Sequence, residues 1–131
     1  MPNSYRKVSK AKPMISRGTF LNMIEAENAL VLVAEIEGEV IGFLCAGIEC
    51  HDEDYVSRAS CHVDIYELSV TKIFQKQGAG FGLITEAEKC GKSKKACETA
   101  ILAYAFNENT LDFYKHNGFE PYGIQLKKKI D

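Results

Sequence analysis

Three glycines at alternate positions constrain this chain more than any other feature of its sequence. Gly78, Gly80 and Gly82 stand between an apolar, β-favouring run that ends at Val70 and a helical pattern that follows. This order predicts a strand, a glycine-rich turn and a helix N-terminus. The first N–H groups of a helix have no partner within it, and the helix dipole adds partial positive charge there. The turn is therefore predicted to bind an anion, and glycine would let a phosphate approach the backbone without meeting a Cβ atom.

The size and charge of the chain predict one domain that binds a small molecule. With 46% hydrophobic residues, residues 1–131 suffice for a single domain with a core and are too few for two. A net charge of −2 and a pI near 5.9 provide no broad basic surface. Nucleic-acid binding is therefore not expected, and the expected ligand is a small molecule.

The sequence predicts a cytoplasmic protein without a membrane segment. No apolar run approaches the roughly 20 residues of a membrane-spanning helix, and the polar start of the chain lacks the apolar core of a signal peptide. The five cysteines are odd in number and include no C-x-x-C pair. They are expected to be reduced thiols rather than a disulfide framework.

Before the glycine turn, apolar periodicity predicts a helix and three strands. Residues 1–15 contain few apolar side chains and are expected to be an arm or irregular lead-in. Glu37-Gly38 forms a short loop between two β-branched runs, which favours a hairpin. A polar, acidic loop is expected at 51–60. The predicted elements are a helix at about 17–26 capped by Ser16, and strands at 30–36, 39–48 and about 61–70.

After the turn, a helix and a further strand predict one βαβ unit. Because a helix at about 79–92 connects them, the strands at 61–70 and 99–106 should be parallel. The fold class is therefore α/β, with a mixed, largely antiparallel central sheet that contains one parallel βαβ unit. The remaining predicted elements are a short helix capped by Asn107 or Asn109 and stopped at Asn117-Gly118, and a last strand within 119–130.

The order of these elements, together with two short motifs, resembles the GNAT superfamily of N-acetyltransferases. The match extends from about residue 30 to residue 126. The first motif resembles the family's Q/R-x-x-G-x-G/A acyl-CoA signature with a valine five residues upstream, and the second resembles its later tyrosine motif. Their residues here are Val70, Gln75, Gly78 and Gly80 in the first, and Asn107, Phe113, Tyr114, Gly118 and Phe119 in the second. The second motif departs from the usual pattern at Thr110, where alanine is more common.

Two other phosphate-binding folds fit the turn less well. A Walker-type nucleotide loop needs Gly-x-x-x-x-Gly-Lys-Ser/Thr, and none of these three glycines is followed by Gly-Lys-Ser/Thr at that spacing. A dinucleotide-binding Rossmann fold begins with a parallel βαβ series, whereas the strand entering this turn follows an antiparallel hairpin. The resemblance to the GNAT superfamily implies instead that the anion is the pyrophosphate of an acyl-CoA.

The same resemblance implies the co-substrate acetyl-CoA or a related acyl-CoA, no metal, and direct transfer of the acetyl group to a primary amine of a small molecule or protein. The strand before the turn would be splayed from the next parallel strand, and Leu68 and Val70 would pair with the pantetheine arm. The Val70 N–H would polarise the thioester carbonyl. Gln75 and Asn107 belong to the motifs and are counted with the coenzyme-binding residues. The pyrophosphate would be held by backbone N–H groups of Gln77, Gly78, Ala79 and Gly80, with another from Phe81 or Gly82.

Two catalytic side chains follow from the resemblance. Direct transfer needs a base to take the proton of the amine and an acid to protonate the departing CoA thiolate. Tyr114 matches the family's tyrosine acid, and a core aromatic is the alternative interpretation. Glu67 is the candidate base, and Asp64 and His62 are the reserve candidates. The alternative interpretation of Glu67 is a solvated or ion-paired residue of the strand.

Two adjacent Cys-His pairs bracket the acidic loop. Cys50-His51 and Cys61-His62 contain the residue types of a zinc site but lack its usual ligand spacing. They are expected to meet across the mouth of a hairpin. A disulfide between Cys50 and Cys61 is not expected in a reducing cytosol.

The region before residue 30 is shorter than the family pattern, which builds a strand and two helices there as a wall of the acceptor site. Either the acceptor pocket is open or a second subunit completes it, and a homodimer is predicted for this reason. A non-catalytic acyl-CoA-binding or sensing module, and an interaction subunit with the same fold, are the alternatives to an enzyme.

Overall fold

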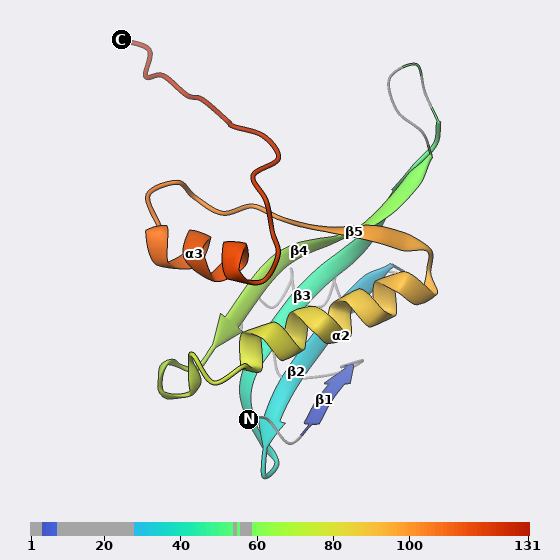
Figure 1. Ribbon diagram of the computed structural model, residues 1–131, viewed down its shortest axis with the longest axis vertical. Coiled ribbons are helices and arrows are strands. Elements are labelled where there is room, and N and C mark those ends of the chain that lie inside the picture. Colours follow the sequence, from blue (N-terminus) through green and yellow to red (C-terminus); the bar gives the residue numbers. More distant parts are fainter. Residues whose placement is uncertain (1–3, 8–27, 54, 56–58) are drawn as a thin grey trace.

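The structure is a computed structural model and describes residues 4–7, 28–53, 55 and 59–131. Five described strands form a sheet in the order β1-β2-β3-β4-β5, with β1 to β4 antiparallel and β4 and β5 parallel (Figure 1). This arrangement confirms the predicted fold class. No described helix is long and apolar enough to cross a membrane. The elements are β1 (Ser4–Lys7), β2 (Ala29–Ile36), β3 (Glu39–His51), β4 (Ser60–Val70), η1 (Lys72–Phe74), α2 (Ala79–Ser93), β5 (Ala96–Ile101) and α3 (Glu108–His116).

The hairpin between β2 and β3 turns at the two predicted residues. Glu37 and Gly38 both have positive φ, 50° and 83°, which is the backbone of a type I′ turn. Such a turn matches the twist of the flanking strands and places Ile36 opposite Glu39. The turn therefore fixes the register of the first pairs, and an extra residue, Ile41, then shifts it so that Ala34 lies opposite Gly42.

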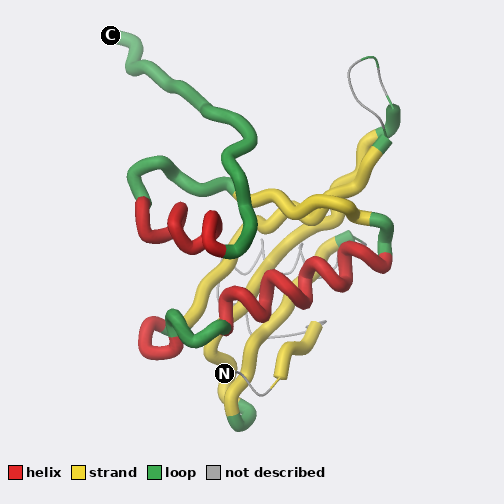
Figure 2. Tube along the Cα trace, in the orientation of Figure 1, coloured by secondary structure: helices red, strands yellow, loops and turns green. Residues whose placement is uncertain are grey.

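Helix α2 crosses one face of the sheet and builds the core with it (Figures 1 and 2). Leu83, Ile84 and Ala87 lie at helical spacing and are at most 3% exposed, as predicted. Near its C-terminal end the helix packs tightly on the sheet at Gly91, where an added Cβ atom would overlap Cγ2 of Val63. There is no room for a side chain between α2 and the sheet at this position. Sheet residues of the same core include Leu30, Leu32, Leu44, Ile48 and Ile65.

Three sequence-based expectations about secondary structure are wrong. Residues 4–7, expected to be irregular, form β1 and pair with β2, because a short edge strand is held by its backbone and needs no apolar pattern. β5 is Ala96–Ile101 and so begins and ends earlier than 99–106, since the exposed residues Cys97 and Glu98 give its start no apolar pattern. Residues 119–130 form no strand, and no described strand pairs with them. The predicted helix at 17–26 lies outside the described residues.

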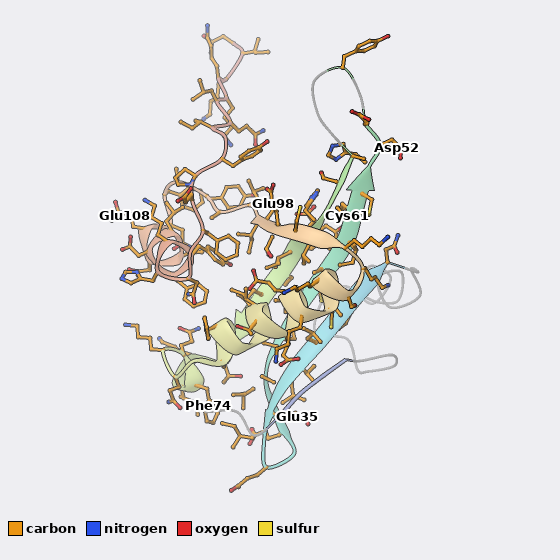
Figure 3. All side chains as sticks on the ribbon, turned by 45° about the vertical axis from the view of Figure 1, so that its right-hand side comes forward. Glu35, Asp52, Cys61, Phe74, Glu98 and Glu108 are labelled. Atoms are coloured by element: carbon orange, nitrogen blue, oxygen red, sulfur yellow. A yellow bond between two sulfur atoms is a disulfide. The ribbon has the colours of Figure 1, made fainter. Side chains whose placement is uncertain are left out.

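A disulfide closes the hairpin between β3 and β4, contrary to the expectation of reduced thiols. Cys50 and Cys61 are opposite one another in the ladder, with their Cα atoms 4.0 Å apart, and their sulfur atoms are bonded. The two cysteines meet across the hairpin as predicted; the wrong expectation was that they would stay reduced. Cys45, Cys90 and Cys97 are free thiols. The disulfide lies at the end of β4 that is far from the glycine turn (Figure 3).

Candidate active site

A β-bulge in β4 opens a wedge between β4 and β5. The register with β3 passes from Glu67 opposite Cys45 to Ile65 opposite Ala46, so Tyr66 is an extra residue. Parallel pairing of β4 with β5 ends at Ile65. Residues 66–70 of β4 therefore have no neighbour in β5, and the two strands separate. This gap is the splayed arrangement that the resemblance implied.

Backbone groups of β4 point into this wedge. The Thr71 N–H donates to the Ile41 carbonyl oxygen at 2.7 Å and so points toward β3. Because successive N–H groups of a strand point to opposite edges, the Val70 N–H points toward the wedge. The Leu68 N–H, two residues earlier, has the same direction. The predicted roles of Leu68 and Val70 require this geometry.

Two glutamine side chains stabilise the turn that follows β4. Gln75 Nε2 donates to the Val70 carbonyl oxygen at 3.0 Å. Gln77 Nε2 donates to the Ile73 carbonyl oxygen at 3.2 Å. Both residues were predicted to bind the coenzyme, and the structure shows that their side chains already bond to the turn itself. Their contribution to a ligand would therefore come mainly from the backbone.

The glycine turn presents the N-terminus of α2. Gly78 has φ of 89° and makes no side-chain cap, and no acidic side chain lies in the first turn. The N–H groups of Ala79, Gly80 and Phe81 have no partner within the helix. Gly82 differs, because its N–H donates to the Gly78 carbonyl oxygen at 2.9 Å. The Gly82 N–H is thus used within the helix, and residues 77–81 remain as the predicted backbone donors.

Gly80 is needed for packing against α3. A Cβ atom on Gly80 would stand 2.8 Å from Cζ of Phe113. The sequence-based interpretation kept that space for a phosphate, but the ring of Phe113 fills it. The contact holds the glycine turn and α3 together. Figure 3 marks η1 with Phe74 and the start of α3 with Glu108, and both lie on the same side of the view as the first turn of α2.

Replacing Gly80 with alanine is expected to displace Phe113. The free energy of unfolding should fall by about 1–3 kcal/mol, as overpacking does, although alanine favours a helix more than glycine. Denaturant unfolding measures the change. In Gly80→Ala/Phe113→Leu the smaller side chain leaves room, so the pair should cost less than the sum of the single changes. Additive costs would show that the ring is not the obstacle.

Tyr114 lies on α3 between two other aromatic rings. Its ring centroid is 5.2 Å from that of Phe113 and 5.4 Å from that of Phe119, edge to face in both cases. The residue is 8% exposed. Burial, and second the negative charge of Glu67, raise the pKa of Tyr114. The phenol is therefore protonated at neutral pH, as a proton donor must be.

Glu67 is exposed on β4 and acts electrostatically on two neighbouring residues. Its charge contributes to the raised pKa of Tyr114. With burial as the larger cause, it also raises the pKa of the Cys45 thiol to about 11. The reserve candidates Asp64 and His62 lie further from the turn along β4. Glu67 is therefore the candidate base that the structure brings together with Tyr114. The described residues include no group of three His, Cys, Asp or Glu side chains placed to hold a metal.

The bulge residue Tyr66 is a feature of the site that the sequence-based interpretation missed. Its hydroxyl donates to Glu49, and its ring lies over Gly47. This hydrogen bond, followed by burial and the charges of Glu49 and Asp64, raises the pKa of Tyr66 to about 12. The Tyr66 hydroxyl is thus already hydrogen-bonded to Glu49. Tyr114 is the tyrosine on which the charge of Glu67 acts.

The sequence carries a signal for this bulge. Core residues of β4 stand at odd positions up to Ile65 and at even positions from Leu68 onward. Such a change of phase needs one extra residue between the two segments.

Asn107 caps α3, as the sequence predicts. Its Oδ1 accepts a hydrogen bond from the Thr110 N–H at 3.3 Å, and Gly118, with φ of 91°, follows the end of the helix. The side chain of Asn107 is therefore used by the helix, and its contact with a coenzyme stays a prediction. An open hollow of about 430 Å³ at this helix start is lined by Phe106, Asn107, Glu108 and Asn109.

The comparisons with known proteins agree with this geometry. Residues 27–121 match the acetyltransferase (GNAT) domain family. A tetramutant of the BH1408 protein of Bacillus halodurans has a similar fold, with a TM-score of 0.83 and 19% identity over 92% of this chain and 78% of that one. No curated protein matches the chain in sequence.

Two solved aminoglycoside acetyltransferases are also similar. The aminoglycoside N-acetyltransferase AAC(6')-Iy in complex with CoA has a TM-score of 0.74 and 22% identity, over 86% of this chain and 74% of that one. The enzyme meta-AAC0020, from an uncultured soil metagenomic sample and in complex with sisomicin, has a TM-score of 0.70 and 23% identity, over 93% and 79% of the two chains. At these identities the structures show a shared fold alone.

Proposed function

The chain belongs to the acetyltransferase (GNAT) family, and we propose on that premise that it transfers the acetyl group of acetyl-CoA directly to a primary amine of a small molecule or a protein. One observation carries the proposal. The wedge between β4 and β5 adjoins an uncapped helix N-terminus, and α3 contacts that helix start through Phe113, the neighbour of a buried Tyr114 on which the charge of Glu67 acts.

The wedge and the helix N-terminus suit the two polar parts of acetyl-CoA. The pyrophosphate would bind to backbone N–H groups of residues 77–81, where the helix dipole adds positive charge. Amide groups of the pantetheine arm would pair with the unpaired edge of β4 at Leu68 and Val70. AAC(6')-Iy, which shares the fold, was solved with CoA, and this supports the choice of donor.

The groups beside the wedge match the needs of direct transfer. The amine nitrogen bonds to the carbonyl carbon, and the bond from that carbon to sulfur breaks. The Val70 N–H would stabilise the oxygen that becomes negative, an effect of about 2.7–4 kcal/mol for one such donor. Glu67, directly or through a water, takes the proton from the amine, and Tyr114 donates to the departing sulfur.

The raised pKa of Tyr114 indicates how it would act on the sulfur. A phenol with a raised pKa is a weaker acid than a thiol. Its main effect is therefore a hydrogen bond to the developing thiolate, and the released CoA thiolate takes its proton from water, because a thiol is protonated at neutral pH. A buried ring strengthens that hydrogen bond by excluding water.

Cys45 does not suit the role of an acetyl carrier, although it neighbours Glu67. The thiol is buried, and its pKa of about 11 keeps it protonated at neutral pH. A cysteine nucleophile reacts as the thiolate. This supports direct transfer rather than a covalent intermediate on Cys45.

Calorimetric titration with acetyl-CoA and with CoA, followed by thiol-release measurements, tests the function. Both ligands should bind at one site per chain, and free CoA should appear only when a suitable amine is present. A panel of polyamines, aminoglycosides and lysine peptides covers the acceptor classes. Binding without thiol release for any amine would favour a non-catalytic acyl-CoA-binding module. Absence of binding would contradict the proposal altogether.

A variant at Phe81 tests the site of the pyrophosphate. Phe81 is 57% exposed, so its loss should cost little stability, and aspartate in the first turn favours the helix. The new charge would repel the pyrophosphate, and Phe81→Asp should weaken CoA binding about tenfold or more. Phe81→Asn, of the same size without the charge, is the control. Equal affinities for the two variants would place the pyrophosphate elsewhere.

A further inference from the structure

The bulge in β4 can form in two ways, and the core does not choose between them. The core residues Ile65 and Leu68 of β4 lie opposite residues of β3 that are separated by Cys45 alone. In the same interval β4 has two residues, Tyr66 and Glu67. Either of the two could stand opposite Cys45 while the other becomes the extra residue. The inward positions on both sides of the bulge are the same in the two arrangements.

The position of the bulge decides where the candidate base points. In the structure Tyr66 is the extra residue, and Glu67 stands opposite Cys45. From this place the Glu67 carboxylate acts on both Cys45 and Tyr114, whose pKa values it raises as the second cause after burial. With Tyr66 opposite Cys45 instead, Glu67 would leave the ladder and its side chain would take another direction.

A contact with β3 holds Tyr66 in its observed place. Its hydroxyl donates to Glu49, and a Cβ atom on Gly47 would overlap the hydroxyl oxygen. Gly47 and Glu49 lie further along β3 than Cys45. Because β3 and β4 are antiparallel, moving Tyr66 opposite Cys45 would carry its ring away from both residues and break the hydrogen bond. The bond therefore favours the arrangement in which Glu67 is paired.

The two exposed residues Tyr66 and Glu49 thus have a role beyond the sheet itself. We propose that Glu49 is a positioning residue for acetyl transfer: through its hydrogen bond with Tyr66 it keeps Glu67 in the ladder with β3, and so fixes the direction of the candidate base. Gly47 contributes by leaving room for the tyrosine ring. The inference rests on the proposed function, in which Glu67 takes the proton from the amine.

The hydrogen bond should matter for the chemical step and not for the binding of acetyl-CoA. Leu68 stands opposite Leu44, and it keeps this partner in either arrangement of the bulge. The edge of β4 proposed to pair with the pantetheine arm is therefore unaffected by the choice. An interaction of this kind acts on kcat and leaves KM unchanged.

Kinetics of two variants test the positioning role. Tyr66→Phe and Glu49→Ala should each lower kcat about tenfold, because the base is then misplaced in most molecules, while the KM for acetyl-CoA stays at its parental value. Both changes remove the same bond, so the double variant should be no slower than either single variant. Glu49→Gln keeps an acceptor oxygen and should recover most of the loss. Glu53→Ala removes an exposed carboxylate just beyond β3 and should leave kcat unchanged.

Two kinetic results would overturn the proposal. One is a parental kcat in both Tyr66→Phe and Glu49→Ala. The other is a double variant whose loss equals the product of the two single losses, because the two side chains would then act independently.

Nuclear magnetic resonance tests the register without any ligand. Cross-strand contacts between backbone protons of Cys45 and Glu67 should be strong in the parent protein. In Glu49→Ala they should weaken, and contacts from Cys45 to Tyr66 should appear in their place. An unchanged pattern in Glu49→Ala overturns the proposal even if kcat falls. Absence of turnover in the parent protein would count against the proposed function alone, and these contacts would still decide whether Glu49 sets the register.

Discussion

Replacing Tyr114 with phenylalanine is expected to lower kcat by about 10- to 100-fold while acetyl-CoA still binds. The ring that packs against Phe113 and Phe119 remains, so the fold should be kept. The lost hydroxyl is the group proposed to donate to the departing sulfur. Thiol release gives kcat, and titration gives the affinity. Tyr122→Phe makes the same change at a fully exposed side chain and should leave both unchanged.

The pH dependence separates a catalytic Tyr114 from a structural one. Burial and the charge of Glu67 raise its pKa, so the neutral phenol persists above the ordinary tyrosine value of about 10. Activity that needs this proton is present below the raised pKa and is lost as the pH rises through it. That alkaline limb should be absent in Tyr114→Phe. A phenylalanine variant with the parental rate and the parental profile would rule out the proposed role.

Gly91→Ala is expected to lower the free energy of unfolding by about 1–3 kcal/mol. Helix propensity alone predicts the opposite, a gain of about 0.8–1 kcal/mol on replacing glycine. The contact decides the sign, because the new Cβ would stand 2.3 Å from Cγ2 of Val63, a stiff β-branched side chain. Gly123→Ala, with nothing within 4 Å of its Cβ, is the control. Denaturant unfolding measures both.

A double variant tests the cause of this loss. In Gly91→Ala/Val63→Ala the methyl groups that collide are removed from the strand. The double variant should therefore lose less stability than the two single variants added together. Strict additivity would mean that α2 moves away from the sheet without regard to Val63.

The parts of the fold that the sequence predicted are those with local chemical causes. Glu37-Gly38 supplies the positive φ values of a hairpin turn, and Asn107 supplies the oxygen that caps α3. The spacing of Leu83 and Ala87 gives the face of α2 that meets the sheet. Each of these signals lies within a few residues of the structure that it specifies.

The parts that the sequence did not predict depend on register between strands. The Cys50–Cys61 bond is an exception, because the meeting of the two residues across the hairpin was predicted and only their oxidation was not, having been judged from the expected redox compartment. The packing role of Gly80 follows from a contact with Phe113, more than thirty residues further along the chain. The core residues of β4 change from odd to even positions around Tyr66, which indicates a bulge. The position of the bulge is certain only once the pairing with β3 is known.

The extra residue in β4, Tyr66, interrupts the pairing of the sheet. Selection for stability alone would favour its removal. Without Tyr66, core residues would alternate regularly from Val63 to Val70, and β5 could pair along the whole strand. Such a chain would gain ladder hydrogen bonds and lose the edge at which the amides of a ligand can pair. If acetyl-CoA pairs with this edge as proposed, turnover depends on the incomplete pairing, and a thermostable descendant of this protein would have to be strengthened away from the bulge.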